Sequence, residues 1–359
     1  MSTADQKQAM LRPPTASPDP FAVAYLQLCE VGYYNPADIP AGVAALPPLD
    51  PTGSWQCLWG PGQSHHNTNL VYVAAYTMAA GQPPTFAAVV TRGTDTDIND
   101  AWGVVEQIWE DFDVAHQAPL PWAPDNPARI ANGTIDGLND IESISINGQT
   151  LVQFLGGYLS APANDNPILV VTGHSLGGCL ASVIAPWLKS ALASQCPNLH
   201  IVPATFAGPS AGNAAFASYF DSSFGYSMRV VNSLDIVPKC WATIHDDDDV
   251  YAPCGIKVPD LIYAAVVGFT AVMKATHVSY VQPSTGFVPL TGVCSGGTNW
   301  YAEAGHQHPA VNYMALLGGT SVSQPTASTP ETAAAKRPTP KSRLRSRLGS
   351  IESFVKEKL

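Results

Sequence analysis

A short apolar segment that runs directly into a Gly-x-Ser-x-Gly motif constrains the fold of this chain more than any other feature. Residues 168–171 are all β-branched or leucine, which predicts a strand buried on both faces of a parallel sheet. Gly173 and Gly177 flank Ser175, as a tight strand-to-helix turn requires, because Cβ atoms would not fit there. The segment therefore predicts a serine hydroxyl, that of Ser175, presented at the start of a helix.

The same pattern occurs a second time, at residues 208–212, and it also follows an apolar segment. The pattern alone cannot choose between Ser175 and Ser210, because so short a motif arises by chance. The segment before Ser210 contains Pro203, which has no N–H to donate and argues against a fully hydrogen-bonded central strand. Local physics therefore favours Ser175 as the nucleophile.

Charge divides the chain into an acidic body and a basic tail. Of the 359 residues, 46% are hydrophobic and only 13% are charged, which is ample for a large core. From Lys336 onward there are eight Lys or Arg and two Asp or Glu, whereas the rest of the chain has a formal charge of −17. An acidic body argues against nucleic-acid binding.

The two ends of the chain differ from the body in composition. Residues 1–19 are polar and lack the basic and apolar parts of a Sec-type signal, so we expect a disordered N-terminus. A single α/β domain is expected over residues 20–319. Residues 320–359 are expected to form a Ser/Thr/Pro-rich disordered linker and a basic amphipathic tail. That tail would contact an anionic membrane surface or a partner, or would be a frayed, solvated terminus.

The longest apolar run, residues 261–273, is too short to cross a bilayer. Together with the missing Sec-type signal, this predicts a cytoplasmic protein or one exported by a non-classical route. The seven cysteines show neither C-x-x-C nor metal-like spacing. We expect most of them to be reduced core residues, with a Cys240–Cys254 disulfide left open, and we expect no metal or cofactor.

Strand-like and helix-like segments alternate along the body, which predicts a mostly parallel central sheet flanked by helices. The expected strands are residues 70–78, 86–91, 168–171, 200–206 and 228–232. The expected helices are residues 20–34, 98–112, 141–160, 178–192 and 213–220.

Beyond Ser175 the chain offers a carboxylate and a late histidine, in the order found in α/β hydrolases. Asp235 follows the strand at residues 228–232, where catalytic groups lie in such sheets, although an ordinary turn aspartate is the alternative. The acidic run at residues 246–249 lacks the spacing of a calcium loop. His306 and His308 both precede an apolar helical stretch, and either can serve as the base.

A developing oxyanion needs two preorganised N–H donors. The backbone of Leu176, the residue after the nucleophile, supplies one of them. Thr94, which follows an earlier strand end and a glycine, supplies the other through its own N–H and orients itself through Oγ1.

With these residues together, the chain resembles the class 3, or fungal-type, lipase family of the α/β-hydrolase superfamily. Each matching piece alone is weak, but five pieces in family order are specific. The pieces are Arg92-Gly93-Thr94, residues 173–178, residues 205–209 with Gly212-Asn213, residues 235–238 and a late histidine ahead of Tyr313.

The resemblance implies an α/β-hydrolase fold with Ser175 as nucleophile and Asp235 as the orienting acid. Because the family places a tyrosine shortly after the histidine, and Tyr313 is five residues after His308, it favours His308 as base over His306. It makes Ser210 structural. The family commonly has an aromatic residue where this chain has Thr91.

The resemblance further implies a serine ester hydrolase that acts on acylglycerols or other lipid esters through an acyl-enzyme. The alternatives are a phospholipase A1 or a feruloyl-type esterase with the same triad, and a catalytically silent lipid-binding module. A helix after the oxyanion residue is a lid in these lipases. Here it would be residues 98–112, with Trp102 and Trp109 as lid or acyl wall, or else a fixed helix.

Overall fold

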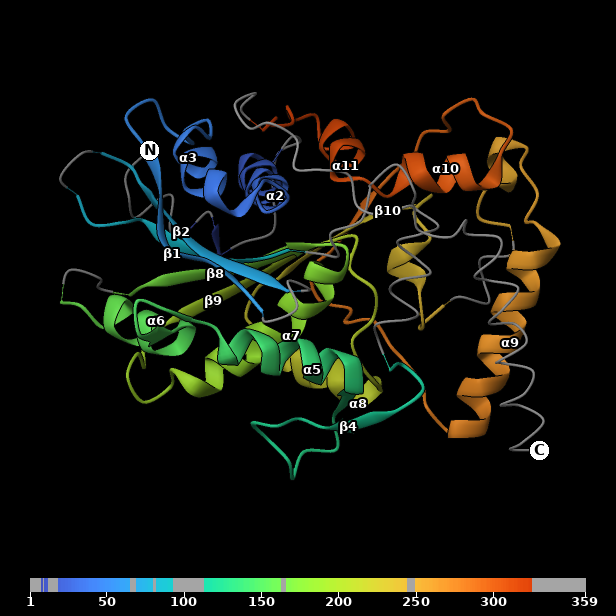
Figure 1. Cartoon of the computed structure of the whole chain (residues 1–359), viewed down its shortest axis with the longest axis horizontal. Coiled ribbons are helices and arrows are strands. Elements are labelled where there is room, and N and C mark those ends of the chain that lie inside the picture. The colour runs from blue at the N-terminus through green and yellow to red at the C-terminus, as the bar shows by residue number, and fades with distance from the viewer. Residues whose placement is uncertain are drawn as a thin grey trace.

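A seven-stranded sheet forms the middle layer of the computed structural model (Figure 1). The structure describes residues 19–64, 69–79, 82–92, 113–162, 166–243 and 249–324, together with residues 8, 10 and 11. In spatial order the strands are β1 (Ser54–Gln63), β2 (Leu70–Thr77), β3 (Phe86–Thr91), β8 (Ile168–His174), β9 (His200–Phe206), β10 (Met228–Asn232) and β11 (Phe287–Leu290). Strands β1 to β3 pair antiparallel, and β3 to β11 pair parallel, which confirms the predicted mostly parallel sheet.

Both faces of the central strands are buried, as the apolar run at residues 168–171 predicts. Leu169 and Val171 of β8 pack into one hydrophobic cluster, and Ile168 and Val170 pack into a second cluster on the opposite face. This alternation follows from the two-residue period of a strand. A chain with this pattern needs helices on both sides of its sheet.

Helices cover both faces, which confirms the α/β architecture. One face carries α5 (Asn132–Ser143), α6 (Leu151–Leu159), α7 (Leu176–Ala191) and α8 (Ala214–Ser223). The other face carries α2 (Pro20–Val31), α3 (Ile39–Ala44) and α11 (Ala310–Leu316). Figure 1 shows α9 (Asp260–Thr276) and α10 (Trp300–Gln307) at the right-hand end of the molecule. Shorter elements are β4 (Gln117–Pro119), β5 (Arg129–Ala131), β6 (Ser145–Ile146), β7 (Gln149–Thr150), η1 (Pro36–Asp38), η2 (Val237–Lys239) and η4 (Ala252–Cys254).

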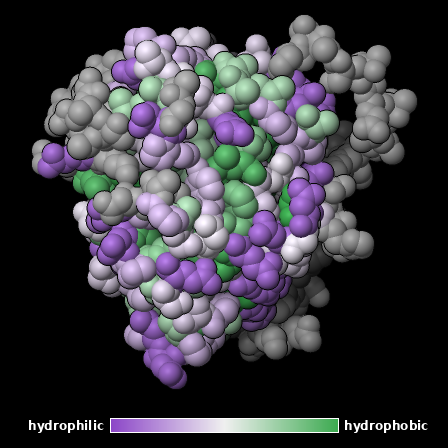
Figure 2. All heavy atoms as spheres, turned by 90° about the vertical axis from the view of Figure 1, so that its left-hand side faces the viewer, coloured by the Kyte–Doolittle hydropathy of each residue, from purple (hydrophilic) through white to green (hydrophobic). Residues whose placement is uncertain are grey.

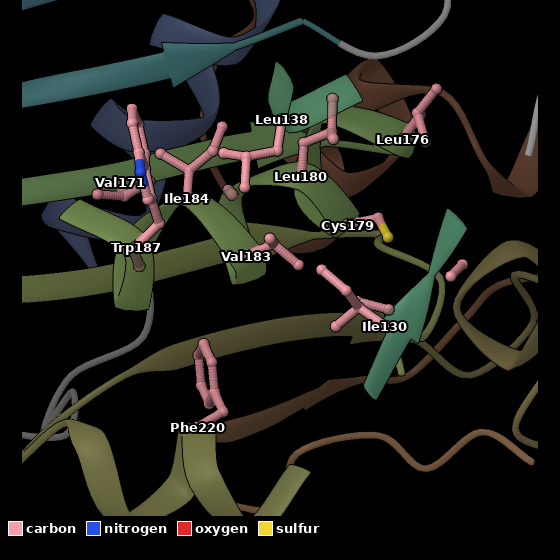
Figure 3. Close-up of a cluster of buried hydrophobic side chains, with 14 of the residues drawn as sticks. Ile130, Leu138, Val171, Leu176, Cys179, Leu180, Val183, Ile184, Trp187 and Phe220 are labelled. Carbon is pink, nitrogen blue, oxygen red and sulfur yellow. The ribbon is translucent and has the colours of Figure 1, made fainter. Parts of the chain in front are cut away.

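Helix α7 is the best buried helix of the first face. Figure 3 shows its side chains Leu180 and Ile184 gathered with Val171 of β8 and Leu138 of α5, all of them with no exposed surface. Such packing holds the helix at a fixed position on the sheet. The turn that joins β8 to α7 therefore lies between a buried strand and a buried helix, and both hold it in position.

The expected helix over residues 141–160 is wrong. Helix α5 ends at Ser143, and a two-residue hairpin of β6 and β7 separates it from α6. Asn147 and Gly148, at φ 53° and 79°, form the hairpin turn, and Asn-Gly is the preferred pair for such a turn. Thr150 then starts α6 with a capping box.

Strand β9 lies in the interior of the sheet despite Pro203, and its bounds are those predicted, residues 200–206. It pairs with β8 over its full length and with β10 from Ala204 onward. The missing N–H of Pro203 lies just outside the segment that both neighbours flank. A proline therefore fits next to the point where the second neighbour begins.

The cysteine pairing differs from the one left open by the sequence. Cys254 is bonded to Cys294, which lies 40 residues further along the chain, and Cys240 is a buried residue outside this disulfide. The described cysteines Cys29, Cys57, Cys179 and Cys196 also lie outside it. Local spacing gave no signal for this pair, because the bond joins two loops on either side of α9 and β11.

Several expectations fall outside the described residues. They concern the lid segment at residues 98–112, most of residues 1–19 and the tail beyond residue 324. Residues 320–324 are described and dock on the N-terminal helices, since Glu30 accepts from the Val322 amide at 3.0 Å and Gln324 donates to Asp38 at 2.9 Å. Within the described chain, no helix has the length and apolar character needed to cross a membrane. The compartment stays a prediction.

Candidate active site

Ser175 occupies the sharp turn between β8 and α7. Its φ of 60° and ψ of −130° are rare for a residue with a side chain, so the turn stores backbone strain. A Cβ at Gly173 would lie 2.2 Å from the carbonyl oxygen of Gly177, and one at Gly178 would lie 2.9 Å from that of Phe206. Glycine at these positions allows the crossing that presents the Ser175 hydroxyl.

The structure brings Ser175, His308 and Asp235 together from three distant parts of the chain. His308 Nε2 lies 2.8 Å from Ser175 Oγ, and His308 Nδ1 lies 2.9 Å from Asp235 Oδ2. All three side chains are buried. Because an ionised carboxylate only accepts, Nδ1 carries the ring proton and Nε2 accepts from the serine hydroxyl. This is the arrangement in which a base can take the serine proton.

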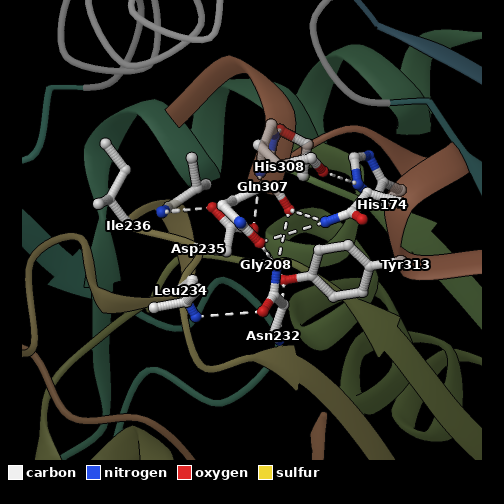
Figure 4. Close-up of polar contacts among 12 residues, drawn as sticks. His174, Gly208, Asn232, Leu234, Asp235, Ile236, Gln307, His308 and Tyr313 are labelled. Atoms are coloured by element: carbon white, nitrogen blue, oxygen red, sulfur yellow. Dashed lines mark hydrogen bonds and ion pairs between the residues drawn. The ribbon is translucent and has the colours of Figure 1, made fainter. Parts of the chain in front are cut away.

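The carboxylate of Asp235 is fully buried and has three donors (Figure 4). Oδ1 accepts from the Val237 amide at 3.0 Å, and Oδ2 accepts from the Tyr313 hydroxyl at 2.7 Å as well as from His308. These hydrogen bonds offset the loss of hydration of the charged group. Burial and the charge of Asp235 raise the pKa of Tyr313 well above its usual value, which keeps the phenol protonated as a donor.

A second row of polar side chains holds the end of α10, where His308 lies. Gln307 accepts from the Asn232 side chain at 2.8 Å and donates to Glu303 at 2.7 Å, and all three residues are buried. The backbone N–H of Asn232 also donates to the Tyr313 hydroxyl at 3.1 Å. The strand end that leads to Asp235 and the helix end that leads to His308 are therefore bonded to each other.

His174 supports the backbone of His308, a role that sequence reasoning missed. Its Nε2 donates to the His308 carbonyl oxygen at 2.9 Å, and its Nδ1 lies 3.3 Å from the Tyr33 hydroxyl of the N-terminal region. Burial, and then the nearby His308, lower the pKa of His174 to about 3. It therefore remains neutral and keeps one tautomer. Its position beside Ser175 was the sole signal in the sequence, and that position indicated packing.

The remaining predicted residues are placed as follows. His306 is exposed on α10, and the hydrogen bond to Ser175 is made by His308. Ser210 is buried, and its Oγ donates to the Val281 carbonyl oxygen at 3.0 Å, which is a structural contact. Leu176 is the first residue of α7, so its amide has no acceptor inside the helix. Thr94, Trp102 and Trp109 lie outside the described residues.

Thr91, the departure from the family pattern, connects the end of β3 to the turn. Its Oγ1 donates to the Gly177 carbonyl oxygen at 2.8 Å and lies 3.3 Å from that of Thr172. An aromatic side chain could not make these bonds. Thr91 therefore holds the end of β3, which precedes the predicted oxyanion residue Thr94 in the sequence, at a fixed distance from the turn that carries Leu176.

Within the described residues, one cluster brings three metal-ligating side chains together, namely Cys254, Cys294 and Glu303. Its two sulfurs are bonded to each other and offer no thiolate. Glu303 is occupied by the Ser295 amide and by Gln307. This cluster is therefore a structural support.

A parallel sheet with a strained serine turn and a buried Ser–His–Asp cluster defines the serine hydrolases of the α/β-hydrolase fold. Residues 88–244, somewhat less than half of the chain, match the family described as Lipase (class 3). This confirms the resemblance noted from the motifs.

Three similar proteins place the match in context. The chain is 37% identical over 94 residues to Lipase ZK262.3 of Caenorhabditis elegans, which is 26% of either chain. It is 36% identical over 74 residues to the chloroplastic Phospholipase A1-Igamma2 of Arabidopsis thaliana, covering 20% of this chain and 14% of that one. The matched segments thus span about a quarter or less of these relatives. The crystal structure of M37 lipase superposes with a TM-score of 0.70 at 27% identity, covering 82% of this chain and 92% of that one.

Proposed function

We propose that this protein is a serine carboxylic-ester hydrolase that acts on lipid esters through an acyl-enzyme. The observation that carries the proposal is the position of His308, within hydrogen-bond distance of both Ser175 and Asp235. The match of residues 88–244 to the class 3 lipase family and the likeness to M37 lipase support a lipid ester as the substrate.

In the proposed reaction, Ser175 Oγ attacks the ester carbonyl carbon while its proton moves to His308 Nε2. The resulting oxyanion accepts from the Leu176 amide and from Thr94, and Asp235 stabilises the imidazolium. His308 then gives its proton to the departing alcohol as the ester C–O bond breaks. Water, activated by His308, attacks the acyl-enzyme and releases the carboxylic acid with restoration of Ser175.

A phospholipid sn-1 ester is the second candidate substrate. Two of the relatives that match the chain are named phospholipases A1. The basic tail proposed for residues 320–359 would suit contact with an anionic lipid surface. A feruloyl-type ester is a further alternative with the same triad. A silent lipid-binding module is disfavoured, because nucleophile, base and acid are all within hydrogen-bond distance.

Residues 98–112 are proposed as a lid or acyl-chain wall that includes Trp102 and Trp109. A mobile lid predicts a jump in rate when a short-chain triglyceride passes its solubility limit. A smooth saturation curve through that limit would remove the lid and favour a fixed helix.

A fluorophosphonate probe tests the proposed function directly, since it labels an activated serine. Labelling should be lost in Ser175→Ala and kept in Ser210→Ala, its matched control. Loss of labelling in Ser210→Ala alone would overturn the assignment. A panel of p-nitrophenyl esters of rising chain length, beside phosphatidylcholine, then identifies the preferred acyl chain and head group.

A further inference from the structure

Helix α9 presents an apolar surface to solvent. Its inward side chains, among them Ile262, Ala265, Val266 and Met273, are buried. Its outward side chains Tyr263 and Val267 are 49% and 50% exposed, and Ala264 and Ala271 are exposed beside them. Between Leu261 and Met273 the helix has no charged side chain. A helix at the surface normally has a polar outer face, so this outer stripe (Tyr263, Ala264, Val267 and Ala271) needs an explanation.

Helix α9 packs on the segment that follows Asp235. On the inward side of α9, Phe269 packs against Trp241 with 5.1 Å between ring centroids. Trp241 lies six residues beyond Asp235 and belongs to the same hydrophobic cluster as Leu176, the neighbour of Ser175. Figure 1 shows α9 at the same end of the molecule as α10, which leads to His308. A surface bound by α9 would therefore meet the end of the molecule that carries the site.

The opposite end of the molecule has a different kind of surface. Figure 2 shows hydrophobic residues there in a band that hydrophilic residues border and interrupt. On α9 the charges are confined to the two ends of the helix, at Asp260 and Lys274. The outer stripe therefore has no charged side chain along the middle of a helix of 17 residues.

We propose that the outer stripe of α9 docks this protein on the surface of a lipid aggregate. The inference rests on the proposed function, since the substrate of a lipid-ester hydrolase collects at such surfaces. An uncharged stripe matches hydrocarbon, which demands no specific hydrogen bonds or shape. Tyr263 and Lys274 have an apolar stem and a polar end, as residues at a lipid–water boundary do. The helix would lie in the plane of the surface, as amphipathic interfacial helices do.

A second copy of the chain fits the outer stripe less well. A stable protein interface buries roughly 800 Å² on each partner. Two half-exposed side chains and two alanines on a single helix provide only a small part of that area. A lipid surface has no such minimum, because the strength of interfacial binding scales with the apolar area that enters the surface.

The test separates lipid binding from hydrolysis. Full-length Ser175→Ala protein is mixed with phosphatidylcholine vesicles and separated by flotation, with and without Val267→Glu. The charge should weaken vesicle binding about tenfold, since it would have to enter an apolar layer. The matched control is Val311→Glu on α11, where the side chain is 56% exposed, and it should bind like the parent. Val267→Leu should bind at least as tightly.

With Ser175 intact, Val267→Glu should slow hydrolysis of emulsified tributyrin about tenfold and leave soluble p-nitrophenyl acetate within about twofold. Equal vesicle binding by the Val267→Glu and Val311→Glu proteins would overturn the docking surface. So would a wild-type dimer that Val267→Glu dissociates, because the stripe would then belong to a second copy.

If Val267→Glu also loses the soluble-ester rate, the uncharged variant Val267→Ser tests the docking surface in its place. The proposal requires that Val267→Ser weakens vesicle binding and keeps the soluble-ester rate. Any other result overturns it. Wild-type protein that floats with vesicles but hydrolyses no ester would remove the proposed function and keep the docking surface. Hydrolysis of soluble esters without flotation would remove the docking surface alone.

Discussion

The two Gly-x-Ser-x-Gly motifs follow neighbouring parallel strands, yet their serines have different surroundings. Ser175 begins a helix directly, at φ 60°, with its hydroxyl 2.8 Å from His308. Ser210 precedes α8 by four residues, and its hydroxyl donates to the Val281 backbone. Ser175 is among the described residues with positive φ, and Ser210 is not. The backbone conformation at the serine, more than the five-residue pattern, distinguishes the strained turn at Ser175 from the loop at Ser210.

The largest expected effect separates these two serines. Ser175→Ala should lower kcat for a soluble p-nitrophenyl ester by about 10⁶, because the triad acts as a unit. Ser210→Ala should leave kcat within about threefold but lower the free energy of unfolding by about 1 kcal/mol, since one buried hydrogen bond is lost. Steady-state kinetics and urea unfolding measure the two effects. A comparable loss of kcat in both variants would contradict the different roles given to Ser175 and Ser210.

Asp235→Asn should lower kcat by about 10⁴, because an amide that donates to His308 favours the wrong ring tautomer. The carboxylate is fully buried and hydrogen-bonded, so the variant retains the shape of the site. Kinetics at saturating ester, with circular dichroism to check folding, measures the change. A folded variant with near-normal kcat would rule out Asp235 as the orienting acid.

Tyr313→Phe should lower kcat by roughly tenfold, as loss of an outer hydrogen bond to a functional carboxylate does. It removes the 2.7 Å bond to Asp235 and leaves the Asn232 amide without that acceptor. The free energy of unfolding should also fall by about 1–3 kcal/mol. The pH–rate profile distinguishes a role at the carboxylate from simple destabilisation, because only the former moves the titration of the base.

His174 gives a pH dependence whose sign follows from its lowered pKa of about 3. In the unfolded chain His174 has an ordinary histidine pKa and binds a proton below about pH 6.5. In the native protein it stays unprotonated at that pH. Stability from this group is therefore complete above that pH and is lost progressively as pH falls toward 3. His174→Gln should flatten the fall in unfolding free energy between pH 6 and pH 4 by about 1.4 kcal/mol per pH unit. Identical slopes would contradict the assignment.

The smallest effect is expected from the tail. Truncation after Gln324 should leave kcat/KM for a soluble ester unchanged within about twofold, because it keeps the contacts to α2 and η1. Truncation after Gly319 removes the bond from the Val322 amide to Glu30 and should lower the melting temperature. A loss of soluble-ester activity in the protein truncated after Gln324 would show that the tail takes part in the site.

The parts that could be predicted from the sequence are those with local signals. The glycines around Ser175 predict a tight turn wherever it lies, and four apolar residues predict a buried strand. The parts that were missed depend on contacts across long separations. The bonds of His174 to Tyr33 and to His308 join residues 141 and 134 positions apart.

The errors have equally specific causes. The helix expected over residues 141–160 failed because apolar periodicity continues through the Asn147-Gly148 turn, and periodicity alone does not register a two-residue hairpin. The pair of Cys254 and Cys294 has no local pattern at all.

The disulfide also shortens the path along the covalent chain between Asp235 and His308. Asp235 and His308 are 73 residues apart, and the Cys254–Cys294 bond bypasses 40 of them. A chain-entropy account assigns about 4 kcal/mol to closing a loop of that length beforehand. The disulfide therefore lowers the loop-closure entropy that is lost when His308 is brought to Asp235. A chain folded with both thiols reduced would have to complete that search through a loop about twice as long.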